Sequence, residues 1–562
     1  MLSWHLQNVL CPPPPVDPGA RRFGSLARAP CGRPRSLADL CSNSGGSWFN
    51  TAFSYRPEDK VSTKDFLGEY VLPKDLKLDA PESGLPKSGS FGYAVGDSTL
   101  KTNYVIDLTS DKSPFSWHHH TIHAWSRALG HEFFRPFGED NADDHLRYSY
   151  AIAAEAEAGA GGDLQDERLQ EKRALKAPGV RRVLTACRED GLPYPAMVGA
   201  VAVPTEARQF RPFEFTPQYA GVPAEMQTVK DTETKLGGTF VEPIGVNSSL
   251  PNTAKAKLPA PNGPPELLEL DRKWNVPVVQ AAGISSAFIA CAMPTELLHS
   301  FCEYPELVTF ASGVSGSPST GEMGFADGGG VDNLGVHAAL RRNVKKLLVC
   351  VASAGDPSLQ AIGGTLGEAY DVSGLFGACT KDVQMGRDPD RKLGDGFKHC
   401  IDKEVWNDSL QCFEKEQFKN MITELKDKQR FDTQPISCRL KLEVKPNPTQ
   451  GITGGYVADV LFLFNSMPSD WKGKLPPATQ DFIDTKLTDI LSSAGPLEPR
   501  WTFPYVSTYE LEWSPKMVGL SSNLCAYNMN KVREDASYRD FFQFRPKRKA
   551  TESADGEPAA RR

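Results

Sequence analysis

Short apolar runs separated by polar segments predict a sheet whose strands are spread along the chain. Runs rich in β-branched and aliphatic residues have the length of strands at residues 196–203, 343–353, 438–444 and 457–464. Apolar positions recur at helical spacing over residues 47–55, 116–134 and 408–428. Helices and strands are thus interspersed, and the pattern predicts an α/β fold with a central mixed sheet flanked by helices.

Shifts in composition divide the chain into three parts. Residues 1–40 hold seven prolines and predict an irregular N-terminal segment. Residues 41–540 predict one large domain, and residues 541–562 predict a disordered basic and polar tail. Stretches rich in Ala, Gly, Glu or Pro predict insertions in the domain near residues 151–178, 247–265 and 352–396. Loops vary without disturbing a sheet, so we expect these insertions to form a cap or lid.

The charge balance excludes some classes of partner. The 562 residues carry a net charge of -7, which leaves no broad basic surface for nucleic acid or for anionic lipid. Any contact with a membrane is therefore expected to be peripheral, through an apolar rim or a small basic patch. The longest apolar candidate, residues 276–293, is interrupted by Pro277, Gln280 and Gly283, so no membrane-spanning segment is expected.

Cysteine usage and the first residues bear on location. The 12 cysteines include no Cys-x-x-Cys pair, which favours a reducing compartment and a cytoplasmic protein over a zinc or redox protein. Residues 1–40 contain five arginines, two aspartates and neither lysine nor glutamate. This composition is also that of an organelle transit segment, so targeting to an organelle stays open.

The first candidate for chemistry is a glycine-rich turn before the predicted helix at residues 47–55. A small polar residue, Ser44, is followed there by Gly45 and Gly46. Two glycines let the backbone pass close to a substrate, and the helix that follows points its N-terminus at the serine. The turn predicts a serine nucleophile.

The second candidate lies far along the chain, before the predicted strand at residues 343–353. Asp327 is followed by Gly328 and Gly329, which places a carboxylate on a glycine-rich loop. Each segment alone has the composition of an ordinary turn. Together they predict a serine nucleophile with an aspartate as its base.

These two segments resemble the motifs of the cytosolic phospholipase A2 family and its patatin-like relatives, which use a Ser-Asp dyad. The family's turn, Gly-x-Ser-Gly-(Gly/Ser)-(Ser/Thr)-Trp, is matched from the serine onward by residues 44–48. Its aspartate motif, Asp-(Gly/Ser)-Gly followed closely by Asn, is matched by Asp327, Gly328, Gly329 and Asn333. Looser likeness extends over about residues 42–530 and includes residues 191–195, 213–219, 236–240, 283–288 and 503–508.

The resemblance implies a lipid acyl hydrolase that cleaves carboxylic esters of glycerophospholipids or lysophospholipids at a membrane surface. Ser44 is expected to attack the ester carbonyl and Asp327 to accept its proton. The N–H groups of Gly45 and Gly46 are expected to face the oxyanion, while Gly328, Gly329 and Asn333 shape the aspartate loop. The chemistry needs neither a metal nor another cofactor. A classical triad is disfavoured because no histidine stands in a motif.

The chain departs from the family pattern in two places. Ser42 stands where the family has glycine, and residues 1–41 contain no Gly-Gly-Gly-x-Arg-like oxyanion loop. The nearest candidate is Gly19-Ala20-Arg21-Arg22. Either the front of the domain is missing, or the recorded start is wrong, or the loop has been replaced, and the first two alternatives are favoured. A second hypothesis follows, a catalytically impaired lipid-binding or scaffold protein of the same fold.

Two polar clusters outside these motifs contain residue types that can bind metal ions. His119 and His123 share one face of a helix, but no third ligand follows, and a solvent-facing cluster with His118, His120 and His131 is favoured. A second cluster lacks the alternation and the distal glutamate of a calcium loop, so it predicts a solvated turn. It comprises Glu139, Asp140, Asp143 and Asp144.

Overall fold

The computed structural model describes about half of the chain. The described residues are 9–11, 39–56, 61–104, 124–137, 193–203, 209–217, 219–223, 227–228, 235–237, 239–241, 246, 248–249, 271–272, 276, 278–287, 306–312, 318–352, 370–377, 410–428, 433–487, 503–504 and 513–542. The predicted insertion at residues 151–178 and most of those at 247–265 and 352–396 lie outside them, as do the acidic cluster and the histidines from 118 to 123.

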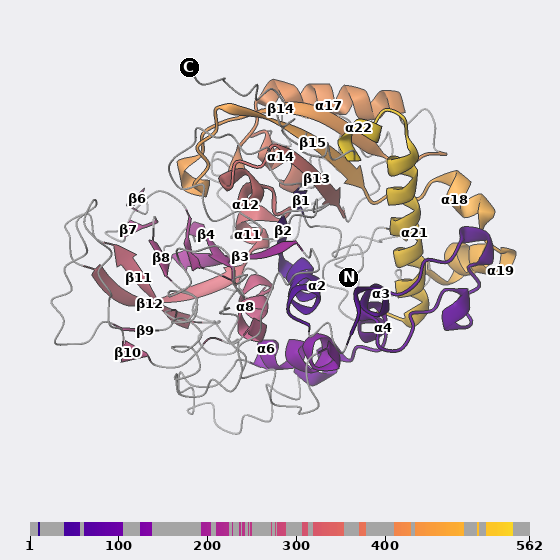
Figure 1. Cartoon of the computed structure of the whole chain (residues 1–562), viewed down its shortest axis with the longest axis horizontal. Coiled ribbons are helices and arrows are strands. Elements are labelled where there is room, and N and C mark those ends of the chain that lie inside the picture. The colour runs from indigo at the N-terminus through magenta and orange to yellow at the C-terminus, as the bar shows by residue number, and fades with distance from the viewer. Residues whose placement is uncertain are drawn as a thin grey trace, which may run out of the picture.

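The main sheet of the described residues has 11 strands and mixes parallel with antiparallel pairs. Its order is β14-β15-β13-β1-β2-β3-β4-β5-β8, with β12 paired to β3 and β11 to β12 (Figure 1). The strands are β1 (Val9–Cys11), β2 (Asp39–Asn43), β3 (Tyr194–Val203), β4 (Gln209–Phe215), β5 (Ala220–Val222), β8 (Thr239–Val241), β11 (Glu306–Ser312), β12 (Pro318–Asp327), β13 (Lys346–Val351), β14 (Ser437–Val444) and β15 (Tyr456–Phe464). Two small ribbons pair β6 (Gln227–Thr228) with β7 (Lys235–Leu236) and β9 (Ser248–Ser249) with β10 (Asp271–Arg272).

Helices accompany this sheet, so the chain mixes helices and strands as the α/β prediction requires. The α-helices are α2 (Ser44–Tyr55), α3 (Thr63–Leu67), α4 (Phe91–Gly96), α6 (Ala124–Leu129), α8 (Val278–Ser285), α11 (Gly329–Asp332), α12 (Val336–Arg341), α14 (Tyr370–Leu375), α17 (Lys415–Lys428), α18 (Ser469–Lys474), α19 (Pro477–Asp481), α21 (Pro515–Glu534) and α22 (Arg539–Phe542). Helical turns of the 3-10 or π type are η2 (Pro73–Asp75), η3 (Pro81–Ser83), η4 (Gly130–Phe134), η5 (Arg135–Phe137), η8 (Pro448–Gln450) and η9 (Phe482–Leu487).

Side chains of the central strands alternate between two core clusters. Leu40, Met197 and Phe325 pack in one cluster with residues of α2 and α8. Their sequence neighbours Cys41 and Val198 pack in the other cluster with residues of α12 and β13. Successive side chains of a strand point to opposite faces, so the two clusters lie on the two sides of the sheet. Figure 1 shows α2 and α8 beside each other and α11 and α12 on the opposite side of β2 and β3.

The strands predicted from apolar runs are all present as β3, β13, β14 and β15. The helix predicted at residues 408–428 begins only at Lys415, because Phe413 forms a bridge with Val444 and cannot also be helical. The helix predicted at residues 116–134 is described from Ala124, and its last turn widens into the π-type η4.

Two predicted boundaries are wrong. Residues 1–40 were expected to be irregular, yet Val9–Cys11 form β1 between β13 and β2, and β2 already begins at Asp39. The tail was expected to begin at residue 541, yet Phe541 is buried in α22, where Lys346 and Arg439 lie over its ring. Both errors have one cause, since strands and helices of three or four residues are too short to show a period.

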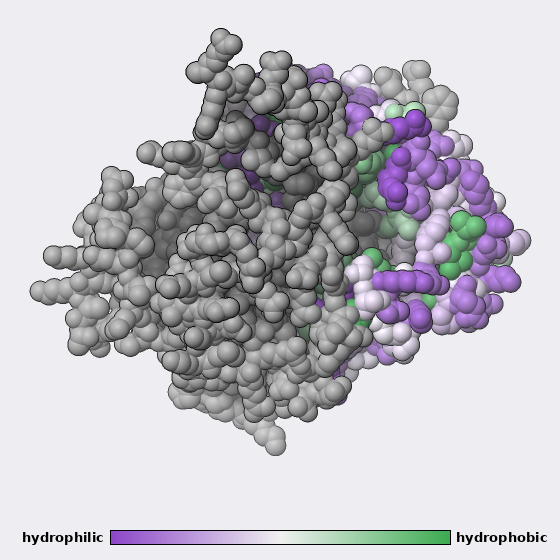
Figure 2. All heavy atoms as spheres, viewed as in Figure 1, coloured by the Kyte–Doolittle hydropathy of each residue, from purple (hydrophilic) through white to green (hydrophobic). Residues whose placement is uncertain are grey.

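The described surface is mainly hydrophilic on the right of the view, with small apolar patches (Figure 2). Three of the exposed large apolar side chains lie close together in the sequence, at the end of α3 and just after it: Leu67, Tyr70 and Leu72. None of the helices that the structure describes is long and apolar enough to cross a lipid bilayer.

Candidate active site

One strand, β3, brings the two sequence motifs together. The parallel strand β2 pairs Asn43 with Val198, and the antiparallel strand β12 pairs Asp327 with Gly199. The other edge of β3 is occupied by β4, so β2 and β12 share one edge and meet end to end. Because Val198 and Gly199 are consecutive, Ser44, the residue after Asn43, lies beside Asp327.

Ser44 occupies a strained turn from strand to helix. It is the first residue of α2 and has a φ of 45°, the left-handed region that side chains other than glycine rarely adopt. Its Oγ donates a hydrogen bond of 2.8 Å to Oδ2 of Asp327, 283 positions away. Both residues are only 5% exposed. The predicted proximity of the two side chains is confirmed, and their catalytic role stays a prediction.

Contacts explain why glycines follow the aspartate. A Cβ on Gly328 would lie 2.0 Å from the carbonyl oxygen of Val198, so only glycine fits against β3. A Cβ on Gly329 would lie 3.1 Å from Oδ1 of Asp327 and 2.9 Å from Oδ1 of Asn333. The N–H of Gly329 donates to Oδ1 of Asp327 at 2.7 Å. The loop therefore holds one oxygen of Asp327 and leaves the other to Ser44.

Burial sets the protonation of Asp327. Removal from water raises the pKa of this carboxyl to about 7, although the hydrogen bonds from Gly329 and Ser44 act to lower it. An aspartate of ordinary pKa is a weak base, whereas one near 7 can take a proton from a hydroxyl at neutral pH. The hydrogen bond from Ser44 and the raised pKa thus both favour Asp327 as the candidate proton acceptor.

This raised pKa predicts a pH-dependent stability difference. Well below the ordinary aspartate pKa of 3.8 the Asp327 carboxyl is protonated in both the folded and the unfolded chain. As pH rises above 3.8 the unfolded chain loses this proton first, so the stability that the protonated carboxyl contributes falls until pH reaches about 7. We expect Asp327→Asn to be more stable than the wild type at pH 8, by at most about 4 kcal/mol, since one pKa unit corresponds to about 1.4 kcal/mol. Urea unfolding at pH 4, 6 and 8 measures the difference. A difference that stays constant over this range contradicts the buried ionisation.

The predicted oxyanion donors lie at the start of α2. Gly45 and Gly46 are buried in its first turn, where N–H groups have no carbonyl partner within the helix. The N–H groups of both glycines therefore lie at the N-terminal end of α2, where Ser44 also lies. Asn333 lies at the end of α11 with its side-chain oxygen next to Gly329, and thus closes the aspartate loop.

Sequence reasoning missed a bridge between the two motifs. Nδ2 of Asn43 donates to the carbonyl oxygen of Asp332, which ties the end of β2 to α11. The Asp332 carboxylate accepts the N–H groups of Val336 at 3.0 Å and Ala338 at 3.2 Å, and it lies 3.2 Å from Nδ1 of His337. Despite burial, His337 holds the pKa of Asp332 below its usual value. The only sequence signal was an acidic residue at capping distance before an apolar helix.

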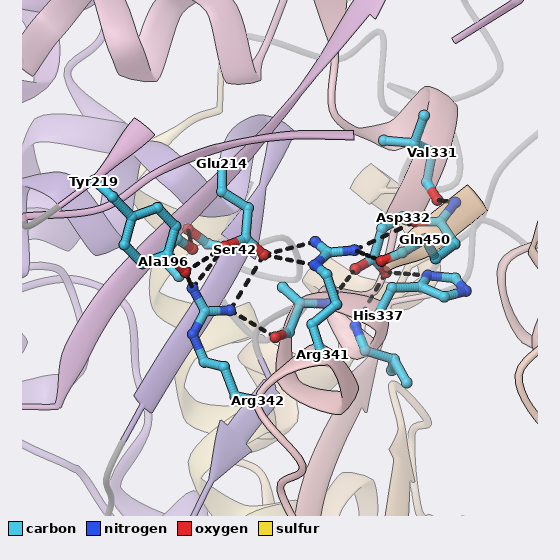
Figure 3. A network of polar contacts seen from close by, with 12 residues as sticks. Ser42, Ala196, Glu214, Tyr219, Val331, Asp332, His337, Arg341, Arg342 and Gln450 are labelled. Atoms are coloured by element: carbon cyan, nitrogen blue, oxygen red, sulfur yellow. Dashed lines mark hydrogen bonds and ion pairs between the residues drawn. The ribbon is translucent and has the colours of Figure 1, made fainter. Parts of the chain in front are cut away.

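A second missed cluster is the ion-pair network around Glu214 of β4 (Figure 3). Its carboxylate lies 2.7 Å from both Arg341 and Arg342 and accepts the hydroxyl of Tyr219 at 2.7 Å. Arg341 also donates to the carbonyl oxygen of Gln450 at 2.9 Å. Although burial opposes it, the two guanidinium groups hold the pKa of Glu214 at about 2. The network joins β4, the end of α12 and η8.

Neither a metal site among the described residues nor a similar known protein gives further information about the site. Among the residues that the structure describes, no group of three His, Cys, Asp or Glu side chains is placed to hold a metal ion. Of the histidines considered above as metal ligands, only His131 is described, and it is half-buried in η4. Comparison of this chain with family models, with curated proteins and with solved structures finds no match.

Proposed function

We propose that this protein is a carboxylic ester hydrolase of the phospholipase A2 or lysophospholipase type, with a patatin-like catalytic domain. The observation that carries the proposal is the 2.8 Å hydrogen bond from Ser44 to a buried aspartate of raised pKa. The left-handed turn from β2 into α2 adds to it, because strained nucleophile turns present a hydroxyl at the end of a sheet.

In the proposed reaction, Oγ of Ser44 attacks the ester carbonyl while Oδ2 of Asp327 takes the hydroxyl proton. The tetrahedral intermediate collapses to an acyl-serine, and Asp327 returns the proton to the leaving alcohol or lysolipid oxygen. Asp327 then takes a proton from water, which attacks the acyl-serine and releases the fatty acid. Ser44 recovers its proton, so the enzyme is unchanged.

Backbone groups would stabilise the negative oxygen of the intermediate. The N–H groups of Gly45 and Gly46 and the positive end of the α2 dipole lie next to Ser44. A single donor of this kind contributes about 3–4 kcal/mol to the transition state.

The substrate class rests on the resemblance of the two motifs and is supported by the surface. Exposed Leu67 and Leu72, with Tyr70 between them, would give the peripheral apolar contact that a lipid surface requires. The five cysteines whose side chains the structure describes are free, which fits a protein that acts on the cytoplasmic face of membranes.

The proposal is tested by fatty-acid release from phosphatidylcholine and lysophosphatidylcholine vesicles. We expect release by the wild type and a transient mass increase of one acyl group on Ser44. A Ser44→Ala variant gives the background of the assay. Vesicle binding with no release above that background would favour the lipid-binding scaffold of the same fold instead.

A further inference from the structure

A line of buried polar side chains runs beneath the nucleophile turn. Ser42, where the family pattern has glycine, is fully buried, and its Oγ accepts a hydrogen bond of 2.7 Å from Nδ2 of Asn50. The same nitrogen donates to the carbonyl oxygen of Leu40 at 2.9 Å. Oδ1 of Asn50 accepts from Ser54 at 3.0 Å. The amide of Asn50 therefore uses both of its N–H groups to tie α2 back to β2.

The line continues on the far side of Ser42. Its Oγ lies 3.2 Å from Oγ of Ser47, which lies 2.7 Å from Oγ of Ser285. Ser285 donates to the carbonyl oxygen of Val198 at 2.5 Å. A hydroxyl has one proton, so Ser285, which donates to Val198, accepts from Ser47. The hydroxyl of Ser42 has two acceptors within reach, Oγ of Ser47 at 3.2 Å and the carbonyl oxygen of Ala196 at 3.5 Å, and the shorter contact favours donation to Ser47. All donors thus point one way, from Ser54 to Val198, an arrangement in which each bond strengthens the next.

The two ends of this chain of bonds correspond to the two halves of the site. Asn50 and Ser42 close the loop whose apex is Ser44, since one lies in α2 and the other in β2. The chain ends on the carbonyl oxygen of Val198, the atom against which Gly328 of the aspartate loop is packed. A shift of the turn would therefore break bonds on both sides of the dyad.

We propose that Ser42 and Asn50 are positioning residues that hold Ser44 in its left-handed conformation, an inference that rests on the proposed function of Ser44. They touch neither substrate nor reacting atoms. They act by fixing the distance and angle from Ser44 to Asp327, and a small misplacement of a reacting group costs up to about a hundredfold in rate.

The test sets the structure against the family pattern. Ser42→Gly restores the residue of the family, so the pattern alone predicts equal or higher activity. The structure predicts a loss, because one N–H of Asn50 loses its acceptor and Ser47 loses its donor. We expect kcat on a water-soluble p-nitrophenyl ester to fall by about 10–100-fold, with KM unchanged within about twofold.

The matched control is Ser437→Gly, the same replacement of a buried strand serine, whose hydroxyl bonds Tyr538 in another core cluster. It should lower the melting temperature about as much as Ser42→Gly and leave kcat within about twofold. Asn50→Leu should reproduce the kcat loss of Ser42→Gly. The double variant should be no more than about threefold worse than either single one, because both break the same chain. Equal activity of Ser42→Gly and the wild type, or strictly additive losses, would overturn the inference.

Amide hydrogen exchange of residues 44–55 separates this inference from the proposed function, because exchange needs no turnover. We expect exchange in this segment to be at least about tenfold faster in Ser42→Gly than in the wild type and unchanged in Ser437→Gly. If the wild type proves inactive, the proposed function fails, yet faster exchange still supports the positioning role. Unchanged exchange overturns it whether or not the wild type is active.

Discussion

Ser44→Ala is expected to lower the kcat of ester hydrolysis by at least about 10⁴-fold, because Ser44 is the proposed nucleophile and alanine has no hydroxyl to carry the acyl group. Asp327→Asn should cost about 10³-fold or more, since the amide keeps the shape of the carboxylate but takes no proton. In the wild type, kcat/KM should rise with pH and level off above about 7, following ionisation of Asp327. Thr479→Ala, which removes a hydroxyl bonded to the carbonyl of Leu76, is the control and should retain full activity. Residual turnover of one part in ten in Ser44→Ala would assign the nucleophile elsewhere.

Glu214→Ala is expected to lower the free energy of unfolding by about 3–5 kcal/mol, because it removes the carboxylate that pairs with two guanidinium groups whose side chains are only 5% and 17% exposed. Glu214→Gln should cost less, since the amide oxygen still accepts a hydrogen bond. Urea denaturation measures both. The control is Asp540→Ala, which removes an exposed carboxylate from Arg439 and should leave the unfolding midpoint nearly unchanged. Equal midpoints for Glu214→Ala and Asp540→Ala would contradict a stabilising role for the network.

The proximity of Ser44 to Asp327 could be predicted from the sequence because local turn chemistry marks both residues. Glycines after each of them restrict where the chain can go, and the family resemblance pairs the two turns. The supports of the site could not be predicted in the same way. The partners of Ser42 include Ser47 nearby but also, through it, Ser285 and Val198 from distant elements. Nothing local distinguishes such serines from ordinary surface hydroxyls.

The fold shows the same division. The sequence predicts a long apolar run such as β15 to within one residue, because the apolar residues of the run themselves indicate that it is buried. The three residues of β1 have no pattern of their own and are strand only because β13 and β2 pair with them on either side. Glu214 lies in residues 213–219, which resemble a family segment, but Arg341 is 127 positions away and no local pattern marks it as the partner of Glu214.

The pairing of β3 with both β2 and β12 also determines how late in synthesis the site can form. The chain is made from its N-terminus, so Ser44 emerges from the ribosome long before the strand on which its turn is built, and Asp327 follows only 283 residues later. Contacts of such sequence separation form slowly and late in folding. A nascent chain therefore carries the serine as an ordinary hydroxyl, and the proposed reactivity toward esters would arise only once β12 pairs with β3.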